Sequence, residues 1–177
     1  RVPGLSRFRP QVPFVDLGHL VRAYSHEIHE CLEEVIDGGY FVGGPITRRF
    51  EEEFAASVGT NHCVGTGNGL DALRLTLEAY GIGPGDEVIT AANSFIASAS
   101  AISFAGARPV FADIDPATYT LDPASVERAI TPRTRALVVV HLYGQPAALD
   151  ALRALARRHG LTIVEAACQA PGAEYKV

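Results

Sequence analysis

Three glycines within five residues, Gly65, Gly67 and Gly69, follow a short apolar stretch and precede a helical pattern. Glycines at a strand-to-helix turn let backbone N–H groups approach a ligand closely, and the dipole of the new helix favours an anion such as phosphate. The spacing is not a dinucleotide-binding fingerprint, because Leu70 stands where its third glycine belongs, and no lysine follows as in a Walker loop. Two interpretations remain: a phosphate cradle, or a tight turn without a ligand.

Two further side chains could complete a ligand site around such a phosphate. Phe95 follows a predicted strand and could stack on a flat ring, or it could be a core residue at the start of a helix. Gln169 follows another predicted strand and could donate a hydrogen bond to a ring oxygen, or it could be solvated. The residue pattern leaves both pairs of alternatives open.

Three other polar residues near strand ends favour structural interpretations. Asp113 and Asp115 form a paired-carboxylate pattern, but the proline that follows them favours turn and capping roles. His141 could act as an acid, a base or a ligand, although its neighbours favour a packed histidine that shapes the loop.

Strand and helix patterns alternate along most of the chain. Such alternation predicts an α/β fold with a mostly parallel sheet and helices on both faces. Ligands bind such sheets at the carboxyl ends of the strands, so five loops could converge on one crevice. Strands are predicted at 62–65, 87–90, 109–112, 136–140 and 162–165, and helices at 70–80, 95–105, 123–129 and 149–159.

The first third of the chain has a different pattern. Residues 1–13 lack periodicity and are predicted to form an N-terminal arm. Apolar residues at helical spacing predict an amphipathic helix over 16–36, and Thr47 is a candidate N-cap of the next helix. His26 and His29 lie one turn apart among glutamates, a pattern that metal sites share with solvated helix faces. We favour the solvated face and predict no metal site.

The composition argues against several classes of partner. The 177 residues are 47% hydrophobic and 20% charged, with a formal net charge of −5 and no concentrated basic patch, so no nucleic-acid partner is expected. No apolar run reaches the roughly 20 residues that span a bilayer, so no membrane partner is expected.

Three widely spaced cysteines are predicted to be reduced thiols of a cytoplasmic protein. Lys176 is the single lysine, so a mechanism that needs a lysine nucleophile has one candidate.

An ordered set of short motifs makes the sequence similar to a known family. In chain order the motifs are Val12–Leu17, Gly44–Pro45 with Phe50–Ala55, Gly69–Leu73, Gly83–Ile89, Asn93–Ser98, Asp113–Pro116, His141–Pro146 and Glu165–Ala170. With them, the chain resembles the N-terminal part of the DegT/DnrJ/EryC1/StrS family, the pyridoxal-phosphate-dependent aminotransferases of nucleotide-activated sugars. The resemblance extends over about residues 12 to 175 in continuous register.

The resemblance implies a fold, a cofactor and a set of binding residues. The fold would be the large domain of the fold-type I aminotransferases, truncated here, because residues 14–177 would lack its C-terminal part and the small domain. The cofactor would be pyridoxal 5′-phosphate, whose phosphate would be held by Asn68, Gly69 and Leu70, largely through backbone amides. Phe95 would stack on the pyridine ring, and Gln169 would approach the phenolic oxygen of that ring.

The resemblance also implies a reaction and partners. Family members transfer an amino group from a donor such as glutamate to a nucleotide-activated keto-sugar, in the biosynthesis of amino sugars and antibiotic sugars. They are usually homodimers with the active site at the interface. The Tyr40–Pro45 loop would lie near that interface or near the sugar nucleotide.

The sequence departs from the family pattern at two points that matter for catalysis. Ala166 stands where the family has an aspartate that keeps the pyridine nitrogen protonated, and the adjacent Glu165 should point to the opposite face of its strand. The lysine that forms a Schiff base with the cofactor would lie beyond Val177, and Lys176 corresponds to a non-catalytic position. No residue of the chain is therefore assigned a catalytic role, and the 177-residue chain alone is expected to be inactive.

Two alternatives to an aminotransferase remain at this point. The first is a non-catalytic family relative that acts as a binding or regulatory partner, which Ala166 favours. The second is an unrelated nucleotide-binding α/β module. Binding of pyridoxal 5′-phosphate would separate the family interpretations from the unrelated module.

Overall fold

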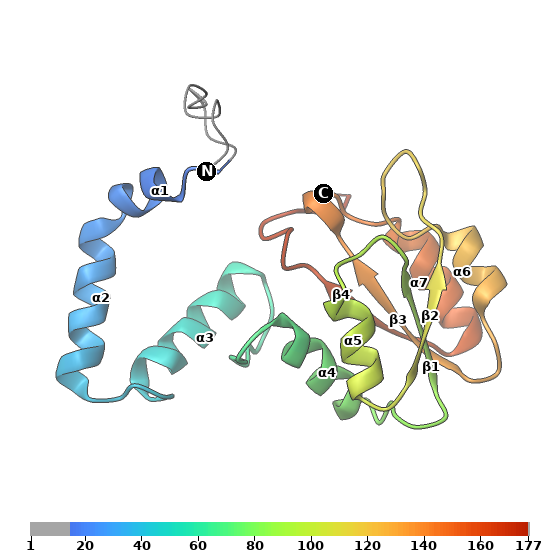
Figure 1. The fold of residues 1–177 in the computed structure, drawn as a ribbon, viewed down its shortest axis with the longest axis horizontal. Coiled ribbons are helices and arrows are strands. Elements are labelled where there is room, and N and C mark those ends of the chain that lie inside the picture. Colours follow the sequence, from blue (N-terminus) through green and yellow to red (C-terminus); the bar gives the residue numbers. More distant parts are fainter. Residues whose placement is uncertain (1–14, 177) are drawn as a thin grey trace, which may run out of the picture.

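The computed structural model describes residues 15–176, and its helices and strands are labelled in Figure 1. The predicted arm at residues 1–13 lies outside the described residues. In chain order the elements are α1 (Leu17–Ala23), α2 (Ser25–Gly38), α3 (Pro45–Ser57), α4 (Gly69–Ala79), β1 (Glu87–Ala91), α5 (Ala97–Phe104), β2 (Arg108–Ala112), α6 (Pro123–Ala129), β3 (Thr134–Val140), a 3₁₀ turn (Leu142–Gly144), α7 (Leu149–His159) and β4 (Thr162–Ala166).

The four strands form one sheet in the order β2-β1-β3-β4, and every neighbouring pair is parallel. Parallel neighbours need crossover connections, which α5, α6 and α7 supply between successive strands. This arrangement confirms the predicted α/β class with its parallel sheet. It also places the carboxyl ends of all four strands at one edge, where the predicted ligand loops begin.

Helices cover both faces of the sheet, as the sequence predicts (Figure 1). Successive strand residues point to opposite faces, so each face has its own apolar core. On one face, Val88 and Val138 pack in a buried cluster with Leu77 of α4 and Ile102 of α5. On the other face, a second buried cluster joins the sheet to α6 and α7 through Ile89, Leu137, Val139, Val126 and Leu152.

A buried carboxylate connects three strands at the opposite edge of the sheet. Glu87, the first residue of β1, is 1% exposed. The Thr131 hydroxyl donates to its Oε2 at 2.6 Å, while Arg133 and Arg108 donate to its Oε1 at 2.7 Å and 2.6 Å. The hydrogen bond from Thr131, followed by those from Arg133 and Arg108, lowers the pKa of Glu87 from 4.5 to about 2. This end of the sheet is therefore held by an ionised carboxylate.

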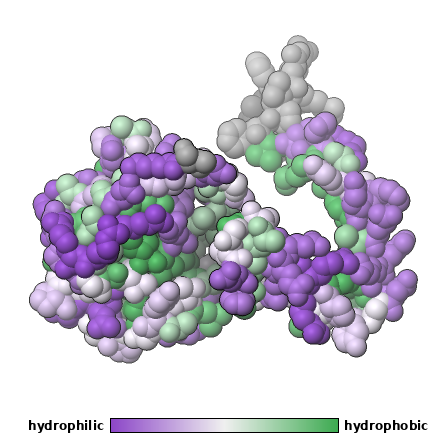
Figure 2. Space-filling model, turned by 180° about the vertical axis from the view of Figure 1, so that it is seen from behind, coloured by the Kyte–Doolittle hydropathy of each residue, from purple (hydrophilic) through white to green (hydrophobic). Residues whose placement is uncertain are grey.

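The first three helices lead away from the sheet as an extended arm (Figure 1). None of the residues in α1 and α2 is buried, and Ala55 is the buried residue of α3. Figure 2 shows hydrophobic residues gathered along the inner side of this helical arm and hydrophilic residues on its outer side. Within residues 15–176, no helix combines the length and the apolar character that crossing a membrane requires.

Three sequence predictions about elements differ from the structure. The strand predicted at 62–65 is not formed, and the Gly65 amide donates instead to the Glu51 carboxylate at 2.7 Å. The helix predicted at 16–36 is interrupted at Tyr24, whose ψ of 16° lies outside the helical region, although its apolar pattern continues across the break. Thr47 is not an N-cap, because Pro45 occupies the first helical position and α3 begins two residues earlier.

Candidate functional site

A pocket of about 510 Å³ lies at the carboxyl ends of β3 and β4, bordered by the first residues of α4 and by the segment that leads into α5. All five residues predicted from the sequence to bind the cofactor line this pocket: Asn68, Gly69, Leu70, Phe95 and Gln169. Val140 and Ala166, the last residues of β3 and β4, also line it. Residues that are a hundred positions apart in the sequence are thus brought to one cavity.

The first turn of α4 presents unpaired backbone amides to the pocket. Asn68 is the N-cap, and its Oδ1 accepts a hydrogen bond from the Asp71 amide at 2.9 Å. The amides of Gly69 and Leu70, at the first two helical positions, have no acceptor within the helix. Such amides at the positive end of a helix dipole favour an anion, so the phosphate-cradle interpretation is compatible with the local geometry.

The glycine at the start of α4 also allows a close approach between two loops. A side chain at Gly69 would place its Cβ 3.4 Å from the Cys168 sulfur in the loop after β4. The loops that contribute the helix N-terminus and Gln169 therefore lie against each other. Both Gly69 and Cys168 line the pocket.

Phe95 is not a core residue. Its side chain is 73% exposed, although it lies just before α5 in a segment that packs against the sheet. Because it borders the pocket and is free of core contacts, its ring is available to a ligand. The exposure of Phe95 excludes the core alternative that the sequence left open, and stacking on a ring stays a prediction.

The side chain of Gln169 is oriented by the chain itself. Its Oε1 accepts a hydrogen bond from the Tyr143 backbone amide at 3.0 Å. Because that oxygen is engaged, the Nε2 end of the amide is the part left to donate. Tyr143 adopts a left-handed backbone conformation with φ of 57°. The sequence does not indicate this conformation, because tyrosine rarely adopts it.

Ala166 and Glu165 point to opposite sides of β4. Glu165 is turned toward α7, where its Oε2 lies 3.0 Å from His141 Nε2 and its Oε1 accepts from Arg153 at 3.2 Å. Ala166 packs on the α4–α5 face and lines the pocket with a methyl group. Among the described residues, those that line the pocket carry no charged side chain. The prediction that Glu165 points to the face of its strand opposite Ala166 agrees with this geometry.

The other polar candidates have structural roles. His141 is buried, and its Nδ1 accepts a hydrogen bond from the Ala147 amide at 3.1 Å, so it fixes the loop after β3. Asp115 accepts from the Ala117 amide at 2.8 Å, as a turn residue does, and neither it nor Asp113 lines the pocket. Lys176 lies outside the pocket and pairs with the Asp150 carboxylate, and that ion pair raises the pKa of Lys176.

Histidines 26 and 29 lie on α2, in the helical arm. His26 is within 3.4 Å of Glu30 on the same exposed helix face, and His29 Nδ1 contacts the Ser25 carbonyl. Over residues 15–176, no group of three or more potential protein ligands is arranged to hold a metal ion.

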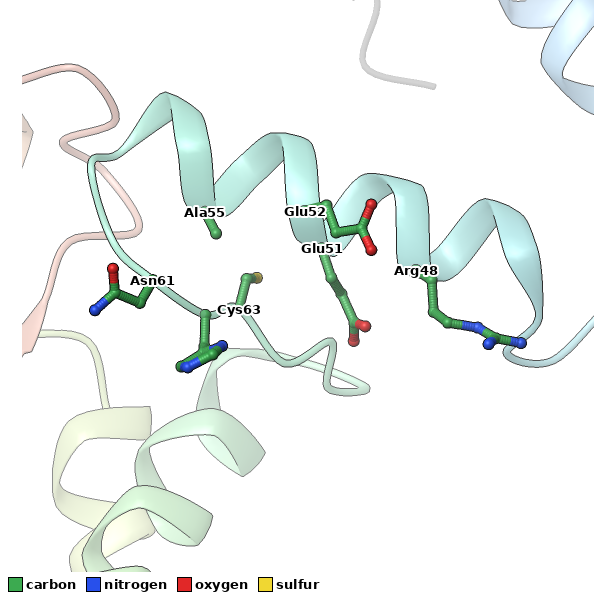
Figure 3. A pocket seen from close by; sticks show the side chains of 7 residues that line it. Arg48, Glu51, Glu52, Ala55, Asn61 and Cys63 are labelled. Carbon is green, nitrogen blue, oxygen red and sulfur yellow. The ribbon is translucent and has the colours of Figure 1, made fainter.

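A second pocket, of about 130 Å³, lies between α3 and the segment that leads to α4 (Figure 3). Figure 3 shows Glu51 directed from α3 toward this segment, where its carboxylate accepts the Gly65 amide at 2.7 Å. The helical arm is thereby joined to the first glycine of the Gly65–Gly69 turn. The sequence did not reveal this contact, since Glu51 belongs to a run of three glutamates that looks uniformly solvated.

The fold and the pocket define an α/β protein with a ligand-sized cavity at the carboxyl ends of its parallel strands, and comparison with known proteins makes the class specific. The model of the DegT/DnrJ/EryC1/StrS aminotransferase family matches residues 23–177, and the chain belongs to that family. Aminotransferases of this family use pyridoxal 5′-phosphate. The resemblance that the sequence motifs carried is thereby confirmed.

Individual relatives agree with this assignment. The chain is 52% identical to a dTDP-3-amino-3,4,6-trideoxy-alpha-D-glucose transaminase of Streptomyces venezuelae, over 94% of the chain and 44% of that protein. It is 48% identical to a pleiotropic regulatory protein of Geobacillus stearothermophilus, over 93% of the chain and 44% of that protein. The crystal structure of NtdA from Bacillus subtilis with bound cofactor PMP superposes with a TM-score of 0.88 at 37% identity, over 94% of the chain and 39% of NtdA. The chain thus spans less than half the length of these relatives.

Proposed function

We propose that the protein is a pyridoxal-phosphate-dependent aminotransferase that acts on a nucleotide-activated keto-sugar in amino-sugar biosynthesis. One observation carries the proposal: the free amides of α4, the exposed Phe95 ring and the Gln169 amide line one pocket at the strand ends. The family supports the cofactor, and the transaminase of Streptomyces venezuelae supports a sugar linked to a nucleotide as the substrate.

The residues present fit three parts of the cofactor: the phosphate, one face of the ring and the phenolic oxygen. Asn68, Gly69 and Leu70 would hold the phosphate, because two unpaired amides meet at the positive end of α4. Phe95 would cover one face of the ring and exclude water from it, and the Nε2 of Gln169 would donate to the phenolic oxygen. When bound, pyridoxal 5′-phosphate supplies a reactive aldehyde on an electron-withdrawing ring.

The residues do not fit the nitrogen edge of the ring. A protonated pyridine nitrogen needs an anionic or strongly accepting partner in an apolar pocket, and Ala166 offers a methyl group. We therefore propose that the site binds the neutral form of the ring, and that amino transfer by a full-length protein with this site is weak. That the 177-residue chain alone is inactive stays a prediction.

A second candidate function is a non-catalytic member of the family that binds a partner or an effector through the same fold. Ala166 favours it, and so does the 48% identity to a relative named as a pleiotropic regulatory protein. Both candidates retain cofactor binding. They differ in whether an amino group is transferred.

The remaining parts of the proposal concern partners. Glutamate or a similar amino acid would be the amino donor, and the protein would be a cytoplasmic homodimer with the Tyr40–Pro45 loop near the interface. The exposed Phe41 and Val42 of that loop support an interface, because large apolar side chains in a soluble protein are often covered by a partner. No role for nucleic acid or membrane enters the proposal.

Titration of the full-length protein with pyridoxal 5′-phosphate, followed by absorbance, tests the cofactor site. Phe95→Ala should weaken binding about tenfold, because stacking on an aromatic ring contributes on the order of 1 kcal/mol. The matched control is Phe104→Ala, an equally exposed phenylalanine at the far end of α5, which should bind as the wild type does. Equal losses in both variants, or no binding by the wild type, would contradict the proposed site.

An assay with glutamate and a dTDP-linked keto-sugar then separates the two candidate functions. Formation of the dTDP-linked amino sugar, even at a low rate, supports the aminotransferase. Cofactor binding without any amino transfer by the full-length protein supports the non-catalytic relative.

A further inference from the structure

Tyr143 combines an unfavourable backbone with an unpacked side chain. Its φ of 57° and ψ of 21° place it in the left-handed region. Residues other than glycine, asparagine and aspartate adopt this backbone conformation only with strain. Its side chain is 81% exposed, and within residues 15–176 the structure gives its hydroxyl no hydrogen bond and its ring no aromatic partner. The tyrosine side chain thus contributes little to the fold that holds it.

The turn that contains Tyr143 borders the pocket. Leu142 and Gln169 line the cavity, and the Tyr143 amide donates to Gln169 Oε1 at 3.0 Å. The following residue, Gly144, has φ of 84°, and a Cβ there would lie 3.3 Å from the Gln169 carbonyl oxygen. The turn is therefore pressed against the loop after β4. Tyr143 is not itself a lining residue, but it directly follows Leu142, which is one, and its amide binds Gln169, which is another.

Backbone strain of this kind is found mainly at residues that have a functional role, such as binding a ligand. Glycine or asparagine would adopt the same turn with less strain and would keep the amide that orients Gln169. What these residues would lack is an exposed aromatic ring with a phenolic hydroxyl, next in the chain to a residue that lines the pocket. The side chain is thus free to contact a ligand that projects from the pocket.

We propose that Tyr143 is a specificity-determining residue whose ring contacts the sugar ring of the substrate. This inference rests on the proposed function. Gln169 would face the cofactor, and Tyr143 is one hydrogen bond from Gln169, so the part of the substrate within its reach is the sugar that reacts and not the distant nucleotide. The C–H face of a pyranose packs on an aromatic face, and a phenol can exchange hydrogen bonds with sugar hydroxyls.

A matched control exists in the same chain. Tyr119 also has φ of 57° and is 56% exposed, and its turn is likewise fixed by an amide side chain, since Asn93 donates to its carbonyl oxygen at 3.1 Å. Gln169, the hydrogen-bond partner of Tyr143, lines the pocket, whereas Asn93, the partner of Tyr119, does not. Tyr119 therefore shares the backbone conformation and the exposure but not the position.

The test compares Tyr143→Asn, Tyr143→Phe and Tyr119→Asn in the full-length protein loaded with pyridoxal 5′-phosphate. The probes are dTDP-3-amino-3,4,6-trideoxy-α-D-glucose, the sugar nucleotide named for the Streptomyces venezuelae relative, and dTDP alone, both by isothermal titration calorimetry. Tyr143→Asn should weaken binding of the amino sugar about three- to tenfold and leave dTDP binding unchanged, since an aromatic contact contributes about 0.5–1.5 kcal/mol. Tyr143→Phe should keep most of the affinity, and Tyr119→Asn should keep all of it.

The thermal midpoint and the oligomeric state are measured on the same variants. Asparagine tolerates the left-handed conformation, so Tyr143→Asn should unfold at the same temperature as the wild type or higher. A clearly lower midpoint, or a change in oligomeric state, would mean that the ring is packed by the protein itself and would overturn the inference. Equal weakening for dTDP alone would place the contact on the nucleotide and would also overturn it.

Failure of this inference can be told apart from failure of the proposed function. Cofactor binding by the wild type together with an unchanged amino-sugar affinity in Tyr143→Asn overturns the role of Tyr143 alone. No cofactor binding by the wild type overturns the proposed function, on which the role depends.

Discussion

Ala166 is the single residue with the largest expected effect on chemistry. It ends β4 and lines the pocket, while the neighbouring carboxylate of Glu165 faces His141 and Arg153 on the other side of the strand. We predict that Ala166→Asp in the full-length protein raises the rate of amino transfer about 10- to 100-fold. A carboxylate that accepts a charge-assisted hydrogen bond from the ring nitrogen contributes about 1.5–3 kcal/mol. Initial rates with glutamate and a dTDP-linked keto-sugar measure this effect.

Ala166→Asn is the control for size and polarity, because it fills the same space without a charge. It should leave the rate within a few-fold of the wild type. Equal gains in both variants would show that filling the pocket, and not the charge, is responsible. An unchanged rate in Ala166→Asp would count against the need for an acid at this position.

The residues of the site differ in how far the sequence could predict them. The glycines before a helix indicate a phosphate cradle or a tight turn, and only the family resemblance assigns the cofactor to Asn68, Gly69 and Leu70. The structure places these three residues in one pocket with Phe95 and Gln169, and their role stays a prediction. The exposure of Phe95 was not predictable, since a phenylalanine before a helix is compatible with either a core or a rim position. The left-handed turn at Tyr143 was missed because tyrosine is not a residue type that signals such a turn.

At the scale of an element, the start of α4 depends on the cap that Asn68 provides. Asn68→Ala removes the acceptor for the Asp71 amide and should lower the free energy of unfolding by about 1 kcal/mol. Asn68→Ser keeps an acceptor and should lose little stability. Urea denaturation of the three proteins gives the difference, and cofactor titration should rank their affinities in the same order. Equal destabilisation by alanine and serine would exclude capping as the reason.

Glu87, at the amino end of β1, should make the stability of the fold depend on pH. The folded-state pKa of Glu87 is about 2, below the ordinary value of 4.5, so its ionised form stabilises the fold above pH 4.5. That contribution is lost as the pH falls from 4.5 toward 2, because the proton then binds the unfolded chain more tightly. Glu87→Gln should therefore flatten the dependence of the unfolding free energy on pH in this window, measured by urea denaturation.

An exposed carboxylate serves as the comparison for Glu87. Glu127 pairs with Arg158 at 2.8 Å on the surface, and surface pairs contribute little. Glu127→Gln should keep the pH dependence of the wild type. A slope that is equally flat in both variants would argue against Glu87 as its source.

Elements were predictable where periodicity and burial coincide. The helices at 123–129 and 149–159 agree with the structure, and the strands β1 to β4 were found to within two residues, since each lies in a core that its apolar pattern reflects. The segment 62–65 is apolar in part, but a strand also needs a neighbour with free backbone groups, and the side chain of Glu51 bonds the Gly65 amide instead. The hydrogen bond between Glu51 and Gly65 joins residues fourteen positions apart, so a local sequence pattern cannot predict it.

At the scale of the whole molecule, the chain consists of a sheet with two cores and a helical arm with none. The amphipathic pattern over 16–36 predicted an apolar face, and the structure leaves Leu20, Ile28 and Leu32 exposed on α1 and α2. Helices of this length are stabilised mainly by tertiary packing, so the inner face of the arm requires a surface to pack against. The sequence reveals such a face but not the surface that covers it.

The proposed homodimer would bury the Tyr40–Pro45 loop of each copy. Phe41 and Val42 follow α2 in the Tyr40–Pro45 loop and are 72% and 93% exposed, which suits side chains buried by a second copy. The double variant Phe41→Ser, Val42→Ser should raise the dimer dissociation constant of the full-length protein at least about tenfold, because central apolar residues contribute more than 1 kcal/mol each. Sedimentation equilibrium measures this change. Tyr80→Ser, at an exposed position after α4, is the control and should dimerise normally. A monomeric wild type at micromolar concentration, or a double variant that dimerises as tightly as the control, would mean that the loop meets no second copy.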